Sequence, residues 1–133
     1  MLKNLDRALA MLLSLGAIGH TFGSIAAFRG HPAQLLWALC ARVLIVLISA
    51  INLLRTWRPG DRLLAWLAAM GALCWLVVSV AFGVIVDNLT DLRVVVFAIL
   101  SVGLIIFSVK DALAKGRIAA VCEFSRWSLS SDL

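Results

Sequence analysis

The chain has 133 residues, of which 63% are hydrophobic and only 14% charged, and its mean hydropathy is +1.05. Soluble domains are about 45–50% apolar and about 25% charged, so this composition excludes an ordinary soluble enzyme or binding domain. The formal net charge of +5 does not indicate nucleic-acid binding, because the basic residues lie between apolar segments as they do in membrane proteins.

The apolar residues fall in four segments, at positions 8–28, 34–54, 63–86 and 92–109. An α-helix needs about 20 residues to cross a bilayer core, and in lipid its backbone groups are satisfied within the segment. The sequence therefore predicts an all-α membrane protein, a four-transmembrane-helix bundle of two tandem helical hairpins with short loops, over residues 1–112. Residues 113–133 are predicted to be a cytoplasmic basic tail, which either forms a short interfacial helix or frays.

The distribution of charge predicts the orientation. If the four segments alternate in direction, nine basic residues fall on one side: Lys3, Arg7, Arg55, Arg58, Arg62, Lys110, Lys115, Arg117 and Arg126. Two, Arg29 and Arg93, fall on the other. Because loops rich in Lys and Arg stay in the cytoplasm, we predict a multi-pass protein of the cell inner membrane with cytoplasmic N- and C-termini. The first segment runs past the length of a signal-peptide core and is expected to be an uncleaved anchor.

The two halves of the chain resemble each other. With an offset of 55 residues, positions 6–26 lie over positions 61–81, and 9 of these 21 positions are identical. The matches include the Asp-Arg pairs at 6–7 and 61–62 and the glycines Gly16 and Gly71. This pattern predicts an internal repeat of two hairpins in the same orientation, related by an axis along the membrane normal.

The first segment places a histidine among small residues. At 100° per residue, Gly16, His20 and Gly23 share one face of the helix, and Ile18 and Ile25 lie on the opposite face. Membrane helices pack through small residues and expose bulky apolar ones to lipid, so His20 is expected to face protein. Gly16, Gly19, Gly23 and Gly71 are the predicted helix-packing residues. An ordinary packing role, with the ring bonded to a neighbouring carbonyl or serine, is the alternative for His20.

The second segment carries the one unambiguous charge within the predicted spans, Arg42. It shares a stripe with Ser49 and Asn52, opposite a face that includes Ile48. At ~1.5 Å per residue, Arg42 and His20 both lie about 10–12 Å below the outer face of a core of ~30 Å. The two side chains are therefore predicted to meet, although Arg42 could also extend to the outer headgroups.

These positions suggest a ligand site near the outer leaflet. Intramembrane charges tend to face protein or water and to mark function, and an arginine fork suits phosphate. The candidate ligand-binding residues are His20, Thr21, Ser24, Arg42, Ser49, Asn52 and Ser79.

The remaining residues favour a protein that is not an enzyme. All seven acidic residues lie at segment ends or in loops, and neither His31 nor the three cysteines completes a metal or haem ligand set. We therefore expect no metal, cofactor or catalytic residue, and predict a bundle that binds a lipid, a quinone or a membrane partner. The alternative is a small transporter or channel with an anion path past Arg42 and His20. Expected partners are membrane lipids and further copies of the chain or a larger membrane complex, with no nucleic acid. We find no motif that assigns the chain to a family.

Overall fold

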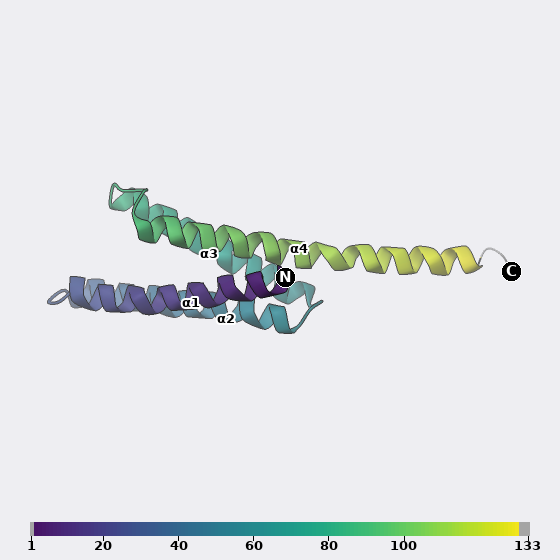
Figure 1. Ribbon diagram of the computed structural model, residues 1–133, viewed down its shortest axis with the longest axis horizontal. Helices are drawn as coiled ribbons and strands as arrows, with labels where there is room; N and C mark the ends of the chain where they lie inside the picture. The colour runs from purple at the N-terminus through teal and green to yellow at the C-terminus, as the bar shows by residue number, and fades with distance from the viewer. Residues whose placement is uncertain (1, 131–133) are drawn as a thin grey trace.

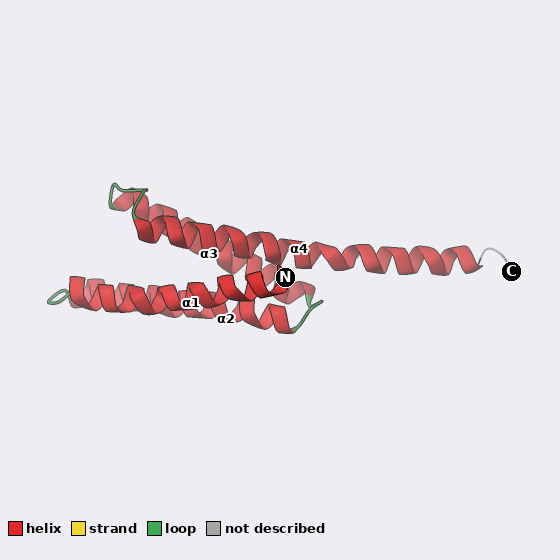
Figure 2. Ribbon diagram, in the orientation of Figure 1, coloured by secondary structure: helices red, strands yellow, loops and turns green. Residues whose placement is uncertain are grey.

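The computed structural model describes the backbone of residues 2–130 and the side chains of residues 2–114. The chain forms four α-helices, shown in red in Figure 2: α1 (Leu2–Ala27), α2 (Pro32–Trp57), α3 (Arg62–Ile85) and α4 (Leu92–Ser130). No strand occurs between residues 2 and 130. The last three residues of the predicted tail, 131–133, lie outside the described residues.

All four helices are long and apolar enough to cross a membrane. The candidate spans are Leu2–Ala27, Pro32–Trp57, Arg62–Ile85 and Leu92–Ala114. Their 26, 26, 24 and 23 residues correspond to lengths of about 35–39 Å at ~1.5 Å per residue, somewhat more than a hydrocarbon core of ~30 Å. The protein is thus a small, multi-pass integral membrane protein with an all-α four-helix fold.

The turns between helices follow local sequence signals. Gly30 and Gly60 have positive φ angles of 87° and 110°, a backbone conformation that glycine adopts at little cost. Asp61 forms the N-cap of α3 and accepts a hydrogen bond from the backbone N–H of Leu64 at 3.0 Å. These short connections make sequential helices antiparallel neighbours.

The helices form two hairpins that diverge along their length. Figure 1 shows α1 and α2 as one pair and α3 and α4 as the other, and the contacts within each pair are more extensive than those between pairs. The hairpins approach each other near the N-terminus, at the end of the bundle that also carries the 58–61 connection. They are further apart at the opposite end, which carries the 28–31 and 86–91 turns (Figure 1). We call these the linker end and the turn end.

The core lies between the two hairpins. Leu13 of α1, Ile45 of α2 and Leu104 of α4 are completely buried there, together with several alanines. The α1–α4 and α2–α3 pairs provide most of the contact between hairpins. Small residues on these faces allow the helix backbones to approach closely.

Two of the four predicted packing glycines lie in close contacts between hairpins. A Cβ atom on Gly16 would stand 2.8 Å from Cε1 of Phe97 in α4, and one on Gly71 would stand 3.3 Å from Cγ1 of Ile48 in α2. Gly19 and Gly23 do not pack as expected, because a Cβ atom on either would meet nothing within 4 Å. The reason is the divergence of the hairpins, which separates α1 from α4 toward the turn end.

Two further features of the helices were not predicted: the burial of Ile48 and the length of α4. Ile48 was expected to face lipid but is buried against α3. The buried face of α2 is centred nearer to Ile48 than the predicted stripe of Arg42, Ser49 and Asn52 suggests. At residue 113, where the tail is predicted to begin, α4 continues without a break to Ser130 and extends well past the other helices at the linker end (Figure 1). The placement of this tail against the membrane stays a prediction.

Candidate ligand-binding site

A cavity of about 490 Å³ lies between the hairpins at the turn end. All four helices contribute to its wall, and most of the lining is apolar or aromatic. The aromatic side chains that line it are Phe28, Trp37, Trp75, Phe82 and Phe97. Its volume falls within the range of roughly 300–1,000 Å³ that is typical of small-molecule sites.

Few polar side chains reach this cavity. The uncharged polar residues that line it are His20 of α1, Gln34 of α2 and Ser79 of α3, and the Ser79 hydroxyl already donates to the carbonyl oxygen of Trp75 at 2.8 Å. His20 is half-buried, and a neutral imidazole can both donate and accept a hydrogen bond. The lining therefore combines a large apolar surface with a small number of groups that can orient a ligand.

Trp75 is the most unusual of the lining residues. Its side chain is 5% exposed, and its ring meets that of Phe97 edge to face with centroids 5.8 Å apart. Its indole Nε1 has no hydrogen-bond partner among the described residues. A buried donor without an acceptor costs roughly 1–3 kcal/mol, and the surrounding atoms close this nitrogen off from the cavity.

The one charged side chain that lines the cavity, among residues 2–114, is Arg93 at the start of α4. Its guanidinium donates to both carboxylate oxygens of Asp91, from Nε at 2.9 Å and from Nη2 at 2.7 Å. It also lies over the ring of Phe82, 5.6 Å from the centroid. The side-chain hydrogen bond from Arg93, aided by one from its backbone N–H, lowers the pKa of Asp91 to about 2. The positive charge at this wall is thus paired.

A smaller cavity of about 320 Å³ lies on the other side of the same residues, between α1 and α4. Gly19, Gly23 and Ser24 line it on the α1 side. His20, Phe28, Phe82, Arg93 and Phe97 line both cavities. These five side chains form a partition between two spaces that together occupy the gap between the diverging hairpins.

Arg42 is absent from the lining of both cavities that His20 lines, so the meeting of Arg42 and His20 stays a prediction. Its side chain is exposed and it lines neither of these two cavities. On the helical wheel Arg42 lies about 80° from the centre of the buried stripe of α2, at 100° per residue. Ala38 and Ala41 line the larger cavity instead. Arg93, which the sequence places at the outer end of the fourth segment, lines both cavities instead.

The other predicted site residues separate into two groups. Thr21, Ser24 and Ser79 are buried in the half of the bundle near the turn end, and Ser24 and Ser79 line the smaller and larger cavity respectively. The Thr21 hydroxyl donates to the carbonyl oxygen of Ala17 at 2.8 Å. Ser49 and Asn52 are buried but line neither cavity.

Ser49 and Asn52 instead join helices toward the linker end. The Ser49 hydroxyl donates to the carbonyl oxygen of Ala10 and lies 2.6 Å from the Ser14 hydroxyl. Asn52 donates to the carbonyl oxygen of Ile48 at 3.0 Å and accepts from Ser108 of α4 at 3.1 Å. Because the polar atoms of both side chains form hydrogen bonds within the protein, Ser49 and Asn52 have a structural role.

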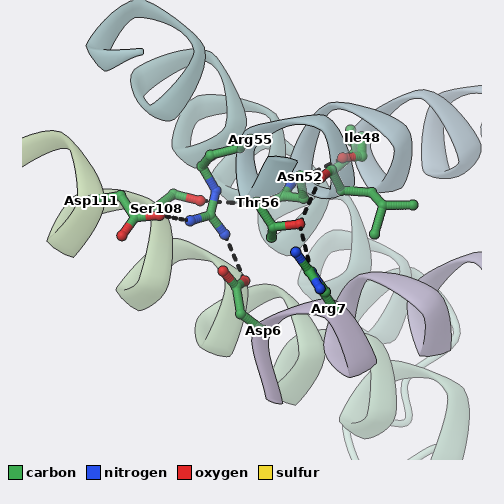
Figure 3. A network of polar contacts seen from close by, with 9 residues as sticks. Asp6, Arg7, Ile48, Asn52, Arg55, Thr56, Ser108 and Asp111 are labelled. Atoms are coloured by element: carbon green, nitrogen blue, oxygen red, sulfur yellow. Dashed lines mark hydrogen bonds and ion pairs between the residues drawn. The ribbon is translucent and has the colours of Figure 1, made fainter. Parts of the chain in front are cut away.

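A buried ion cluster that was not predicted lies at the linker end, drawn in Figure 3. Arg55 of α2, 2% exposed, donates from Nη2 to Asp6 of α1 at 2.6 Å and from Nη1 to Asp111 of α4. Arg7 donates from Nε to Thr56 Oγ1 beside it at 3.3 Å. We call Asp6, Arg55 and Asp111 the linker-end ion cluster, and it ties both hairpins together.

A sequence signal for this cluster exists in the helical periodicity. The buried positions of α1 include Asp6, Ala10, Leu13 and Ala17, spaced by three or four residues. Asp6 therefore continues the inward face of the helix beyond the apolar segment. Asp6 and Arg55 lie just outside the predicted segments because hydropathy falls there, whereas α1 and α2 continue past those points.

Among the described residues, no group of three or more His, Cys, Asp or Glu side chains could hold a metal ion. Comparison of the chain with protein-family models, with curated proteins and with solved structures gave no match. The function is therefore argued from the site alone.

Proposed function

We propose that this protein binds a small, membrane-dissolved molecule in the larger cavity between its hairpins. The observation that carries this proposal is a cavity of about 490 Å³ between the hairpins, lined mostly by apolar and aromatic side chains from all four helices. A molecule that fills the cavity would bury this apolar surface. The protein acts in this proposal as a binding protein and not as an enzyme.

The contrast between the two ends of the bundle supports this proposal. The linker-end ion cluster and the fully buried Leu13, Ile45 and Leu104 hold the hairpins together at one end and in the centre. The turn end has no comparable cluster among residues 2–114, since its one ion pair, Arg93–Asp91, lies within a single turn. A ligand could thus enter between the hairpins from the lipid without breaking the core.

The alternative of an anion path past Arg42 and His20 gains no support. Arg42 is exposed, and the packed core lies between the cavity and the linker end. A binding site that is closed toward one face fits these contacts better than a continuous pathway.

The orientation and the partners complete the proposal. We propose that the linker end and both termini are cytoplasmic, in the inner membrane, so that the cavity lies in the outer half of the bilayer. The hairpins are proposed to descend from one duplicated hairpin. Association with further copies of the chain, or with a larger membrane complex, stays a prediction.

Extraction of the purified protein tests this proposal. The full chain is purified in nanodiscs, and organic extracts are compared by mass spectrometry for wild type, Ala38→Trp and Ala50→Trp. Ala38 lines the cavity, whereas Ala50 is exposed on the same helix. We expect a compound that is enriched over empty nanodiscs in wild type and Ala50→Trp and is lost in Ala38→Trp. No enriched compound, or equal recovery from both variants, would overturn the proposal.

A further inference from the structure

We infer that the two cavities together bind one glycerophospholipid with two hydrocarbon chains, with one chain in each cavity and the headgroup beside Arg93. This inference rests on the proposed function and names the class of its ligand. It follows from the length of the two cavities, from the side chains that they share and from a guanidinium nitrogen that remains available for a ligand.

Both cavities have the length of one membrane leaflet. The larger cavity is lined along α3 from Trp75 to Ile85. The smaller cavity is lined along α1 from Gly16 to Ala27. These two helix segments rise about 15 Å and about 17 Å at ~1.5 Å per residue, and half of a hydrocarbon core of ~30 Å is about 15 Å. Each cavity therefore matches one chain of a lipid in the leaflet at the turn end.

The linings of both cavities suit hydrocarbon. Most of the larger cavity is apolar or aromatic. The smaller cavity is wide along α1, because a Cβ atom on Gly19 or Gly23 would meet nothing within 4 Å. Lipid tails are as apolar as these walls, so the filled cavities are favoured by the van der Waals contacts that an empty space forfeits.

The two cavities share one wall, which reaches the turn end. The side chains that line both cavities are His20, Phe28, Phe82, Arg93 and Phe97. Phe28 follows the last residue of α1, and Arg93 is the second residue of α4. Two chains on opposite sides of this wall would meet at the turn end, which favours one molecule with two chains over two separate ligands.

Arg93 offers a polar contact where the two chains would join. Its Nε and Nη2 donate to Asp91, whereas its Nη1 has no acceptor among residues 2–114. The Arg93 side chain is 62% exposed, so Nη1 is accessible to a ligand. Guanidinium groups are strong donors to phosphate, and a phosphate oxygen could bind Nη1 without displacing Asp91. The neighbouring carboxylate complements an ammonium group, so the pair fits a zwitterionic headgroup.

Native mass spectrometry of the full chain in detergent micelles tests this inference with two probes that have the same headgroup. Dioleoyl phosphatidylethanolamine has two chains, and monooleoyl lysophosphatidylethanolamine has one. We expect wild type to bind one copy of the two-chain probe, at least tenfold more tightly than the one-chain probe. Equal affinity for the two probes would overturn the inference.

Variants that fill either cavity should prevent binding of the two-chain probe. Ala38→Trp fills the larger cavity from α2, and Gly23→Phe fills the smaller one from α1. We expect at least a tenfold loss of affinity in each. The matched controls, Ala50→Trp and Ile18→Phe, lie at exposed positions that line neither cavity and should bind as wild type does. If Gly23→Phe does not fold, Gly19→Phe fills the smaller cavity from a second position.

The headgroup contact has its own control. Dioleoylglycerol keeps both chains and lacks the phosphate, and we expect it to bind wild type at least fivefold more weakly than dioleoyl phosphatidylethanolamine does. In Arg93→Gln this difference should disappear. A difference that persists unchanged in Arg93→Gln would overturn the placement of the headgroup, and with it the inference.

The pattern of losses separates the inference from the proposed function. A loss in Ala38→Trp alone would overturn the two-chain assignment and leave the proposed function standing, because the ligand would then occupy only the larger cavity. No loss in either cavity-filling variant would overturn the inference. If extraction of the wild type also yields no enriched compound, the proposed function is wrong as well.

Discussion

Arg55 is the largest fully buried side chain in the described part of the protein, and it bridges carboxylates from the first and last helices. Such a charge is costly to bury unless its partners are well placed, and removal of one partner leaves the other uncompensated. Asp6 is itself buried and has no other ion-pair partner among residues 2–114. The cluster therefore makes the linker end the rigid end of the bundle.

Substitution of Arg55 should be strongly destabilising. Arg55→Ala leaves the Asp6 carboxylate buried and unpaired, and we expect the free energy of unfolding in mixed micelles to fall by about 3–5 kcal/mol. Arg58→Ala, at an exposed position near the same end, should change it by less than about 0.5 kcal/mol. Equal effects of the two variants would show that the cluster does not hold the hairpins together.

Asp91 provides a residue-scale test of the Arg93 pair. Hydrogen bonding from Arg93 lowers the pKa of Asp91 from 3.8 to about 2. A lowered pKa means that the pair stabilises the folded protein above pH 3.8 and that this contribution is lost as the pH falls through about 2. The pair should therefore be intact throughout the physiological range. Carboxyl ¹³C NMR should show a midpoint near pH 2 for Asp91, moving toward 3.8 in Arg93→Gln; an unchanged midpoint would contradict the assignment.

At the scale of helices, glycines determine how closely the hairpins approach. Gly16 and Gly71 occupy matching positions in the two halves of the sequence, and each lies in a contact between hairpins, α1 with α4 and α3 with α2. The matched Asp-Arg pairs differ in role: Asp6 belongs to the linker-end ion cluster, and Asp61 caps α3. His20 and Trp75 also match, and both line the larger cavity.

Substitution by alanine distinguishes the glycines that pack against a neighbouring helix from those that face empty space. Gly16→Ala would place Cβ 2.8 Å from the Phe97 ring, and we expect a loss of about 1–3 kcal/mol in unfolding free energy from overpacking. Gly19→Ala meets nothing within 4 Å and should be neutral or stabilising by up to about 1 kcal/mol. Thermal unfolding of the two variants in the same detergent measures the difference, and a more stable Gly16→Ala variant would refute the contact.

Hydropathy predicts the four helices because each has to cover a bilayer core with apolar residues. It misplaces their ends: the first predicted segment starts at residue 8, whereas α1 starts at Leu2. Polar residues such as Asp6 remain helical because their partners lie on other helices, which hydropathy does not register.

The site was predictable only in part. The small-residue face of α1 places His20 toward protein, and His20 does line the cavity. Trp75 and Arg93 could not be assigned in the same way, because their roles depend on the divergence of the hairpins and on the partners that each side chain finds. The position of Arg42 could not be derived from periodicity, because a residue at the edge of a buried stripe can face either way and tertiary contacts decide; in the structure it is exposed and lines neither cavity.

At the scale of the whole molecule, the bundle is closed at one end and divided by cavities at the other. The predicted orientation places the closed end in the cytoplasm and the cavities in the outer half of the bilayer. The linker and the 86–91 turn, at opposite ends of the bundle (Figure 1), distinguish the two possible orientations.

Thiol labelling in intact cells tests that orientation. In a background without the three native cysteines, Leu89→Cys lies in an outer turn and Arg58→Cys in the linker, both at exposed positions. A membrane-impermeant maleimide should label Leu89→Cys in intact cells and Arg58→Cys only after lysis, because basic loops stay in the cytoplasm. The reverse pattern would contradict the orientation.

Photochemical capture in living cells tests the central claim, that the larger cavity holds a small molecule. A benzophenone amino acid is introduced at Val78, which lines the cavity, or at its neighbour Val77, which is exposed and does not line it. After irradiation, intact-mass spectrometry should show a discrete small adduct at position 78 that is absent at position 77. The same phospholipid adducts at both positions, with no distinct species at 78, would contradict the claim.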